Sequence, residues 1–481
     1  MPKPDSMARL SSFLSHSLSF HIFVFLLLLL QVCSQLAVSR SIVKFLPGFP
    51  GPLPFDLETG YVAVGDSEDV QLFYYFVKSE RSPKESPLLL WLIGGPGCSG
   101  WTGVAYEIGP LNFKIEKYNG TLPELVLNPH SWTKISSIIF VDSPVGTGFS
   151  YARTPVASQS GDLKQVHHLH QFLVKWLIDH PEFVSNAVYV GGHSYTGIPI
   201  PILVQQISSG NEEGVHPFIN LQGYILGNPM TDPSSDDNSV IPRAYGLGFI
   251  SDELYQSLKR TCGEEYAITS PRNADCLKYV EASYECLSGI NFHHVLEPSC
   301  AFASPKPHAT FDQRRSLYQN LKVFLDPDPS LPPFGCRNYG YLLSRYWAND
   351  DGVRKALHTR KGSIGEWERC KSGLAYTHDV QSSFKYHVNL STKGYRSLIY
   401  SGDHDMIVPS LGTQAWIRSL NYSIVDDWRS WIVQGQVAGY TRTYSNRMTF
   451  ATVKGGGHTA PEYRPEECFA IFKRWISHEP L

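Results

Sequence analysis

The chain has 481 residues, of which 42% are hydrophobic, 13% are aromatic and only 18% are charged. This composition predicts a globular protein with a well-packed core, and the length suits either two or three average domains or one α/β domain with insertions. The formal net charge is −3, so the chain has no basic surplus to attract phosphate backbones, and nucleic acid is not an expected partner.

The N-terminus carries a targeting pattern. An apolar run at 20–32 follows Lys3 and Arg9 and has the length of a signal-peptide core, which is short for a membrane span. Residues 1–34 are therefore predicted to be a signal peptide cleaved near Ser34, and an uncleaved signal anchor is the alternative. Cleavage would send the chain along the secretory pathway to the vacuole or the cell exterior, with no stable membrane span.

The rest of the chain alternates between strand and helix patterns. Residues 60–75 predict an antiparallel hairpin, and helices are predicted at 162–178 and 197–209. Further strands are predicted near Leu88, Ser137, Ala187, Leu221, Leu398 and Met448. Such alternation is typical of a mostly parallel sheet covered by helices.

The alternation fails between 232 and 345, a segment with five of the eight cysteines that lie beyond the leader. We interpret this segment as a cap inserted into the core, placed to roof an active site. The predicted organisation is therefore a first core part at 35–231, a cap at 232–345 and a second core part at 346–481.

A glycine-rich turn follows the apolar strand predicted at 88–92 and spans residues 93–100, Ile-Gly-Gly-Pro-Gly-Cys-Ser-Gly. Such a turn presents backbone N–H groups with no side chains in the way. A phosphate cradle is the alternative, which is disfavoured because no Gly-Lys-Ser/Thr follows. The N–H groups of Gly95 and Tyr195 are instead predicted to bind an oxyanion.

Three motifs supply a nucleophile, an acid and a base. Ser194 follows the strand predicted at 187–190 in Gly-Gly-His-Ser-Tyr-Thr-Gly, where Thr196 stands in place of the second glycine of Gly-x-Ser-x-Gly. Asp405 and His458 follow the strands predicted at 397–400 and 448–453.

Asp403 competes for the role of the acid. Asp405 is preferred because the acid of an α/β-hydrolase usually lies three residues after the glycine of this turn, which here is Gly402.

The order Ser, Asp, His, with each residue at a strand end, predicts an α/β-hydrolase fold with a central, mostly parallel sheet and an inserted cap. It also predicts an enzyme that works through an acyl-serine, a reaction that needs no cofactor and no metal. A lipase or general esterase would share this triad. A binding protein without activity would normally have lost one member of it.

The motifs resemble those of serine carboxypeptidases over nearly the whole chain after the leader. The matching stretches are 91–99, 142–151, 192–197, 227–229, 401–409 and 455–461. The stretches 341–358, 428–444 and 462–477 resemble more closely the plant serine carboxypeptidase-like acyltransferases. The resemblance implies transfer of an acyl group from a glucose ester to an alcohol or sugar acceptor, so the expected partners are a small-molecule acyl donor and acceptor.

Two positions that differ from the peptidase motifs bear on the activity. The peptidases carry Asn and Glu where this chain has Ile93 and His193, and the resemblance places both positions, with Trp91 and Gly94, in the substrate site. Isoleucine has no donor, so a substrate carboxylate would lose a charge-assisted hydrogen bond worth about 1.5–3 kcal/mol. This favours acyl transfer. Release of C-terminal amino acids remains the alternative, because a protonated His193 could bind a carboxylate at acidic pH.

The cysteines and asparagines fit an exported chain. The resemblance implies disulfides joining Cys98 to Cys336, Cys262 to Cys276 and Cys286 to Cys300, with Cys370 and Cys468 left free. Asn119, Asn389 and Asn421 lie in Asn-x-Ser/Thr motifs and are predicted glycosylation sites. Relatives are often cut in a linker comparable to 303–326, so the mature form is expected to be a monomer or a heterodimer of two processed chains.

Overall fold

The computed structural model describes residues 39–267, 273–300, 332 and 334–481. The predicted signal peptide at 1–34 and the predicted linker at 303–326 lie outside the described residues. Residues 40–481 group into one compact unit.

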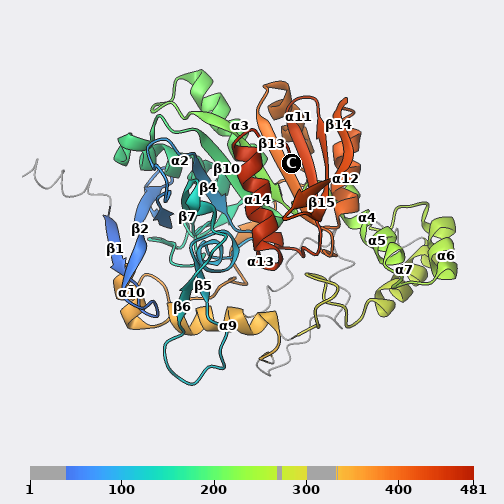
Figure 1. Ribbon diagram of the computed structural model, residues 1–481, viewed down its shortest axis with the longest axis horizontal. Helices are drawn as coiled ribbons and strands as arrows, with labels where there is room; N and C mark the ends of the chain where they lie inside the picture. The colour runs from blue at the N-terminus through green and yellow to red at the C-terminus, as the bar shows by residue number, and fades with distance from the viewer. Residues whose placement is uncertain (1–38, 268–272, 301–331, 333) are drawn as a thin grey trace, which may run out of the picture. The chain divides into compact units, whose positions relative to one another are not determined.

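Among the described residues, twelve strands form one large sheet (Figure 1). Their order is β1-β2-β3-β7-β4-β10-β11-β13-β16-β15-β14, and β8 pairs with β3. The bounds are β1 (Ser39–Phe45), β2 (Pro52–Val64), β3 (Val70–Val77), β4 (Leu88–Leu92), β7 (Ser137–Val141), β8 (Tyr151–Ala152), β10 (Val188–His193), β11 (Leu221–Gly227), β13 (Arg396–Gly402), β14 (Ile424–Val433), β15 (Gln436–Tyr444) and β16 (Met448–Val453). The strands from β7 to β16 in this order run parallel, and the pairs at both edges are antiparallel.

Two short ribbons lie outside the large sheet. They pair β5 (Leu111–Phe113) with β6 (Leu125–Leu127), and β9 (Ser160–Gly161) with β12 (Tyr376–Thr377). Single helical turns are η1 (Gly103–Glu107), η2 (Trp132–Lys134), η3 (Pro181–Phe183) and η4 (Ser194–Gly197).

The helices cover both faces of the sheet. They are α2 (Asp162–Asp179), α3 (Pro199–Glu213), α4 (Pro233–Asn238), α5 (Val240–Gly246), α6 (Asp252–Cys262), α7 (Ala274–Cys286), α9 (Arg337–Ala348), α10 (Asp351–Ala356), α11 (Phe384–Thr392), α12 (Ser410–Ser419), α13 (Ala460–Tyr463) and α14 (Pro465–Ile476). None of the helices in the described part of the chain is long and apolar enough to cross a membrane.

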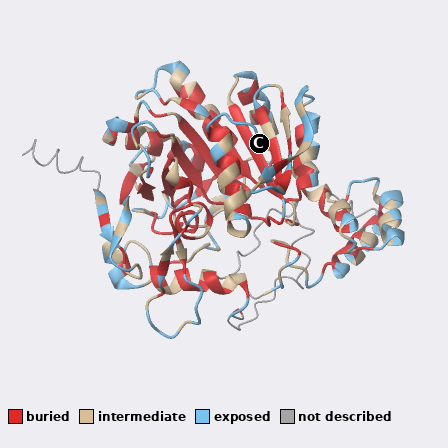
Figure 2. Cartoon of the chain, viewed as in Figure 1, coloured by how far each residue is buried: buried red, intermediate tan, exposed pale blue. Residues whose placement is uncertain are grey.

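Strand β4 shows why the sheet is buried on both sides. Leu88, Leu90 and Leu92 pack into the hydrophobic cluster that includes α2 and α3, whereas Leu89 and Trp91 pack into the one that includes α9 and α14. Successive side chains of a strand point to opposite faces, so an uninterrupted apolar run fits a strand covered on both faces. Figure 2 shows the central strands buried along most of their length.

The sequence predictions for the core agree with these elements. The predicted hairpin at 60–75 is the antiparallel pair β2 and β3, and the predicted helix at 162–178 is α2. The strand predicted at 187–190 is longer at its C-terminal end, because Gly191 and Gly192 continue the ladder with β4 and β11. The predicted α/β-hydrolase architecture, with its mostly parallel central sheet, is confirmed.

The segment after β11 has the helical character expected of the cap. Helices α5, α6 and α7 pack around a hydrophobic cluster of their own, which includes Val240, Leu258 and Val280. Helix α9 begins inside the predicted cap limits, yet Leu342 and Leu343 pack in the main core. The limits 232 and 345 stay a prediction.

The disulfides correct two of the three predicted pairs. Cys262 bonds to Cys276 as predicted. However, Cys98 bonds to Cys370, not to Cys336, and Cys336 bonds to Cys300. Within the described residues, Cys286 and Cys468 are free, and Cys286 is exposed at the end of α7.

The backbone explains the first correction. Ser99 N donates to Arg369 O at 2.7 Å and Lys371 N donates to Gly97 O at 2.9 Å, an antiparallel bridge that sets Cys98 directly opposite Cys370. The glycine-rich turn is therefore tied to the second core part and not to the cap.

Candidate active site

Ser194 stands at a sharp turn between strand and helix. Strand β10 ends at His193, and Ser194 opens the turn η4 with a φ of 61°. This left-handed backbone is unfavourable for a residue with a side chain and is typical of a nucleophile held on an elbow. The glycine-rich turn passes close by: a Cβ on Gly94 would lie 2.7 Å from Ser194 Cβ and 3.1 Å from its Oγ.

The three predicted triad residues meet at one edge of the sheet. Ser194 Oγ lies 2.7 Å from His458 Nε2, and His458 Nδ1 lies 2.9 Å from Asp405 Oδ2. Asp405 is 1% exposed and His458 is 6% exposed, so the bond between them is shielded from water, whereas the bond to Ser194 is only partly buried. With Nδ1 donating to the carboxylate, Nε2 is the acceptor for the serine hydroxyl.

The order of the strands in the sheet explains why these three residues lie close together. Asp405 follows β13 and His458 follows β16, which pair in parallel, and Ser194 follows β10, two strands away from β13. The carboxyl ends of parallel strands lie at the same edge, so residues far apart in sequence gather there. Asp403, the competing acid, binds His404 Nδ1 and accepts the N–H of Gly455.

A further residue, Asn228, orients the acid. Its Nδ2 donates to Asp405 Oδ2 at 2.8 Å, and the N–H groups of Ile407 and Val408 donate to the same carboxylate at 2.8 and 3.2 Å. The sequence motif around Gly227-Asn228-Pro229 gives no indication of this role of Asn228.

A buried carboxylate organises the glycine-rich turn. Asp142 accepts hydrogen bonds from Ser99 Oγ and Gly100 N at 2.7 Å each, and from Phe149 N at 2.8 Å. Burial raises the pKa of Asp142 to about 6, although these three donors oppose the shift. The turn is thus held by Asp142 and by the Cys98–Cys370 disulfide. The oxyanion-binding roles of Gly95 and Tyr195 remain predictions.

Trp91, Glu107 and His193 form a buried group beside the triad. Trp91 Nε1 donates to Glu107 Oε2 at 2.9 Å, and His193 Nδ1 lies 3.5 Å from the same oxygen. The His193 and His458 rings are 6.4 Å apart, centre to centre. The sequence does not reveal Glu107, because a lone glutamate in an apolar stretch gives no motif signal.

Both ionisable members of this group are neutral near pH 5–6. Burial, reinforced by the charge of Glu462, raises the pKa of Glu107 to about 8, although Trp91 and Arg369 act against the shift. Burial, together with repulsion from His458 and Arg369, lowers the pKa of His193 to about 3. The alternative of a His193 that is protonated at mildly acidic pH does not fit this lowered pKa, and the 3.5 Å contact joins two neutral groups.

Two polar atoms of this group have no hydrogen-bond partner. In the part of the chain that the structure describes, Glu107 Oε1 and His193 Nδ1 are buried and have no hydrogen-bond partner. Ile93, 4% exposed, adds only hydrocarbon, as expected from the sequence.

Arg369 is a second residue of this region that the sequence motifs do not indicate. Its guanidinium lies 3.9 Å from the centre of the Tyr341 ring, and its buried Nε has no hydrogen-bond partner within the described ranges. Its charge acts on Glu107 and His193. Arg369 is brought to this region by the disulfide between its neighbour Cys370 and Cys98, a pairing that was not predicted.

The comparisons with known proteins give the family. A model of the serine carboxypeptidase family matches residues 47–478, which is most of the chain. The chain belongs to the serine carboxypeptidase family. As a member of that family it is an enzyme, and the resemblance noted in its motifs is confirmed.

Relatives of this serine carboxypeptidase family member match along almost their whole length. Serine carboxypeptidase-like 7 of Arabidopsis thaliana is 56% identical over 95% of this chain and 98% of its own. Serine carboxypeptidase-like 19 of the same plant is 52% identical, over 95% and 98%. The crystal structure of Kex1(delta)p, a prohormone-processing carboxypeptidase from Saccharomyces cerevisiae, has a TM-score of 0.70 at 19% identity over 88% of this chain and 92% of its own, a likeness of fold alone.

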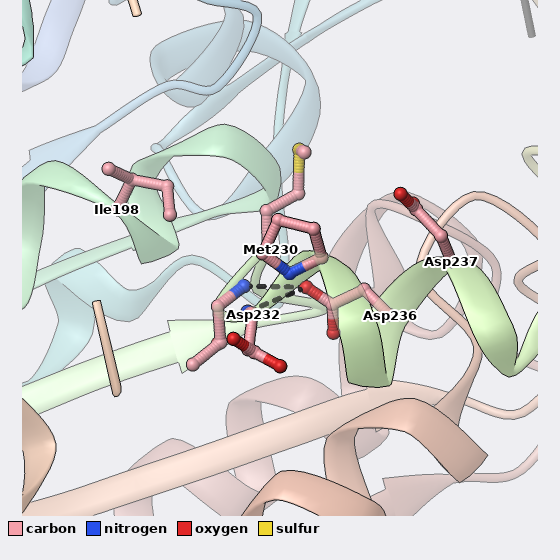
Figure 3. Close-up of a pocket in the computed structure, with 7 residues that line it drawn as sticks. Ile198, Met230, Asp232, Asp236 and Asp237 are labelled. Atoms are coloured by element: carbon pink, nitrogen blue, oxygen red, sulfur yellow. Dashed lines mark hydrogen bonds between the residues drawn. The ribbon is translucent and has the colours of Figure 1, made fainter. Parts of the chain in front are cut away.

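A separate small cavity lies next to the helix that follows the nucleophile turn. Ile198, Met230, Asp232, Asp236 and Asp237 line it (Figure 3), and its volume is ≈ 10 Å³, about the space of one water molecule. No group of three His, Cys, Asp or Glu side chains within residues 39–267, 273–300 and 334–481 is arranged to hold a metal ion.

Proposed function

We propose that this enzyme transfers an acyl group from a glucose ester to an alcohol or sugar acceptor through an acyl-Ser194 intermediate. The observation that carries the proposal is the buried Ile93, which offers no hydrogen bond where the resemblance to peptidases expects an amide that binds a free carboxylate. The neutral state of His193 supports it, because the other expected carboxylate contact then carries no charge.

The proposed first half of the reaction begins at the hydrogen-bonded Ser194 and His458. His458 Nε2 takes the proton of Ser194 Oγ, the oxygen attacks the ester carbonyl, and Asp405 stabilises the charged imidazole. The N–H groups of Gly95 and Tyr195 bind the oxyanion. The bond to glucose breaks, and His458 returns the proton to the departing sugar oxygen.

The second half mirrors the first. An acceptor hydroxyl gives its proton to His458, and its oxygen attacks the acyl carbon. The acyl–Ser194 bond breaks, and the proton returns to Ser194 Oγ. Water in place of the acceptor gives hydrolysis, so a bound acceptor must outcompete water.

The unpartnered atoms beside the triad suit a sugar. A neutral carboxylic acid and a neutral imidazole each provide donor and acceptor capacity, which matches hydroxyl groups better than it matches an ion. Buried polar atoms without a partner are uncommon in folded proteins, and Glu107 Oε1 and His193 Nδ1 would both be satisfied by one bound glucose.

One observation favours a second candidate, the release of C-terminal amino acids. Arg369 supplies a cation whose charge acts on Glu107 and His193 and whose buried Nε has no hydrogen-bond partner among the described residues, and a guanidinium binds carboxylates well. A peptide carboxylate is one such ligand. A carboxylate on the acyl acceptor is another, and it is compatible with transfer.

The deciding experiment supplies both substrates to the purified, glycosylated protein. One reaction contains a phenolic glucose ester with mixed alcohol and sugar acceptors, and the other contains a blocked dipeptide, both at about pH 5–6, just below the ordinary histidine pKa. The proposal expects new esters and no free amino acid. Amino-acid release without ester products would establish the second candidate.

We also propose that the chain travels through the secretory pathway to the vacuole or the cell exterior. The three disulfides fit an oxidising compartment, and the predicted glycosylation sites Asn119, Asn389 and Asn421 are all exposed. Digestion with an N-glycosidase should lower the apparent mass of the protein purified from its native tissue. An unchanged apparent mass would contradict the proposed glycosylation.

A further inference from the structure

A short segment after α7 lies between two loops. One follows β13 and carries Asp405 (the acid loop), and the other follows β16 and carries His458 (the base loop). We name this segment, residues 292–300, the strap. Met406 N donates to Phe292 O at 2.9 Å, and Val295 N donates to His404 O at 3.1 Å. Between these two bonds to the acid loop, His293 O accepts the N–H of His458 at 2.7 Å. The strap is therefore hydrogen-bonded through its backbone to both loops.

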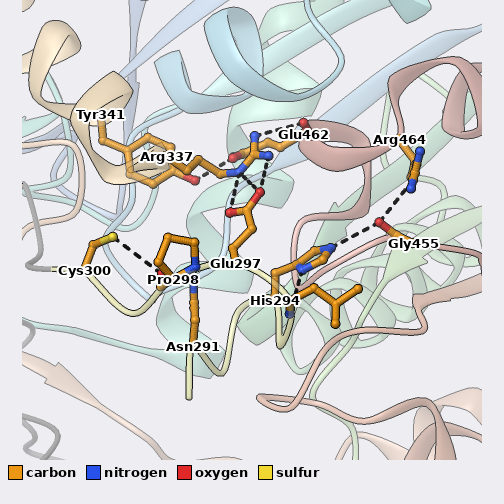
Figure 4. Close-up of polar contacts among 11 residues, drawn as sticks. Asn291, His294, Glu297, Pro298, Cys300, Arg337, Tyr341, Gly455, Glu462 and Arg464 are labelled. Carbon is orange, nitrogen blue, oxygen red and sulfur yellow. Dashed lines mark hydrogen bonds and ion pairs between the residues drawn. The ribbon is translucent and has the colours of Figure 1, made fainter. Parts of the chain in front are cut away.

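The side chains of the strap repeat this arrangement. The His293 ring meets the His458 ring nearly at right angles, with centres 5.6 Å apart. The His294 ring stacks on His404 of the acid loop at 5.1 Å, and its Nε2 lies 3.3 Å from Gly455 O of the base loop (Figure 4).

The base loop passes so close to the strap that it has no room for a side chain. A Cβ on Gly457 would collide with the backbone oxygen of His293. Contact with the strap therefore explains why position 457, the last of the three glycines before His458, is a glycine.

The strap is anchored at its C-terminal end. Glu297 accepts three hydrogen bonds of 2.6–3.2 Å from the guanidinium of Arg337, whose Nη1 also donates to Glu462 O at 3.2 Å (Figure 4). The Cys300–Cys336 disulfide fixes the same end to the start of α9. An ion pair and a covalent bond therefore hold the strap against the core.

We propose that the strap sets the distance and the register between the acid loop and the base loop, and that His293 is a positioning residue that holds the plane of the His458 ring toward Ser194. This inference rests on the proposed Ser194–His458–Asp405 triad, but it does not depend on whether the acyl group passes to an alcohol or to water. It gives the cap segment a direct part in the active site.

Geometry and charge both suit this role. A ring packed edge-on against His458 limits the rotation of the imidazole, which must point one nitrogen at Ser194 and the other at Asp405. Burial, with the charges of His458 and Arg369, lowers the pKa of His293 to about 4, although Asp405 acts in the opposite direction. A neutral His293 lies against a charged His458 without direct repulsion of like charges.

The test measures the reactivity of Ser194 without either proposed substrate. An alkyl fluorophosphonate labels the serine, and 4-nitrophenyl acetate gives kcat and KM. His293→Ala is expected to slow labelling and to lower kcat by about tenfold to a hundredfold, the usual cost of small misplacements, with KM unchanged. His293→Phe restores a flat ring and is expected to recover most of the rate.

A second pair of variants tests the anchor. Glu297→Gln weakens the ion pair that holds the strap and is expected to slow labelling. Glu366→Gln is the matched control, because Glu366 pairs with Arg345 of the same helix α9 at 2.8 Å but lies outside the strap. The control should label at the wild-type rate. Melting temperatures are recorded for all four variants, and the anchor pair keeps the test decisive if His293→Ala does not fold.

The outcomes separate the two proposals. A wild-type protein that does not label at Ser194 would overturn the proposed triad. A wild-type protein that labels, with His293→Ala and Glu297→Gln labelling equally fast, would overturn the strap. His293→Phe as slow as His293→Ala would also overturn it, because the ring nitrogens and not the packing would then matter.

Discussion

The side-chain amide of Asn228 donates to Asp405 Oδ2 at 2.8 Å, the same carboxylate oxygen that faces His458 Nδ1 at 2.9 Å. Asn228 also accepts the N–H of Gly402 through its Oδ1 at 3.1 Å. Its φ of 42° places it in the left-handed region, which asparagine tolerates better than most residues. The end of β11 thus orients the acid at the end of the neighbouring strand β13.

Replacing Asn228 should affect rate more than binding. Asn228→Ala removes one charge-assisted hydrogen bond worth about 1.5–3 kcal/mol. If that loss falls on the transition state, kcat should drop by about tenfold to a hundredfold. Asn220→Ala, at a half-buried asparagine just before β11, is the control. Equal kcat values for both variants in steady-state kinetics would contradict the proposed role of Asn228 in orienting Asp405.

The two candidate acids give opposite predictions. Asp405→Asn should reduce kcat by about 10⁴-fold, because an amide cannot hold the imidazole in the required tautomer or stabilise its charge. Asp403→Asn should keep most of the activity, since the side-chain hydrogen bonds of Asp403 within the described residues go to His404 and Gly455 and not to His458. A larger loss in Asp403→Asn than in Asp405→Asn would reverse the assignment.

Asp236 predicts a pH dependence of stability. Its Oδ2 accepts the N–H groups of Thr231 and Asp232, and its Oδ1 has no hydrogen-bond partner among the described residues (Figure 3). Burial, followed by the charge of Asp237, raises the pKa of Asp236 to about 8, although the two N–H donors oppose the shift. The native state therefore holds this proton more tightly than the unfolded chain, and the associated stability is lost as the pH rises from about 4 to about 8.

Asp236→Asn keeps an acceptor for both N–H groups and cannot ionise. Its melting temperature relative to wild type should therefore rise between pH 4 and pH 8, as measured by calorimetry. Asp66→Asn, at a fully exposed carboxylate, should leave the difference flat. A difference for Asp236→Asn that did not change with pH would show that Asp236 stays ionised in the fold.

The disulfides predict the behaviour of a cut chain. Cys300–Cys336 and Cys98–Cys370 both join residues on opposite sides of the stretch between 300 and 336. Limited proteolysis inside that stretch should therefore give one band on a non-reducing gel and two bands after reduction. Two bands without reductant would contradict the observed pairing.

Local sequence patterns predicted the fold well where the signal itself is local. The apolar run at 88–92 coincides with β4, and the helix periodicity beginning at Asp162 coincides with α2 within one residue. The order of Ser194, Asp405 and His458, each after a strand, was sufficient to predict the fold class, because parallel strands gather their carboxyl ends at one edge.

What the sequence did not predict depends on contacts between distant segments. Cys98 and Cys370 are 272 residues apart, and spacing alone does not distinguish that pair from Cys98 with Cys336. The charge of His193 depends on its burial beside His458 and Arg369, which no motif encodes. Likewise, nothing in the sequence around His293 indicates that its backbone oxygen accepts the N–H of His458.

The central claim is that acyl transfer passes through Ser194. Its most direct test incubates the enzyme with a phenolic glucose ester alone, quenches the reaction in acid and maps the peptides by mass spectrometry. The account predicts an added acyl mass on the peptide that contains Ser194, loss of that mass when an acceptor alcohol is added before the quench, and no adduct in Ser194→Ala. Transfer activity that persists in Ser194→Ala, with no adduct on the wild-type peptide, would contradict the account.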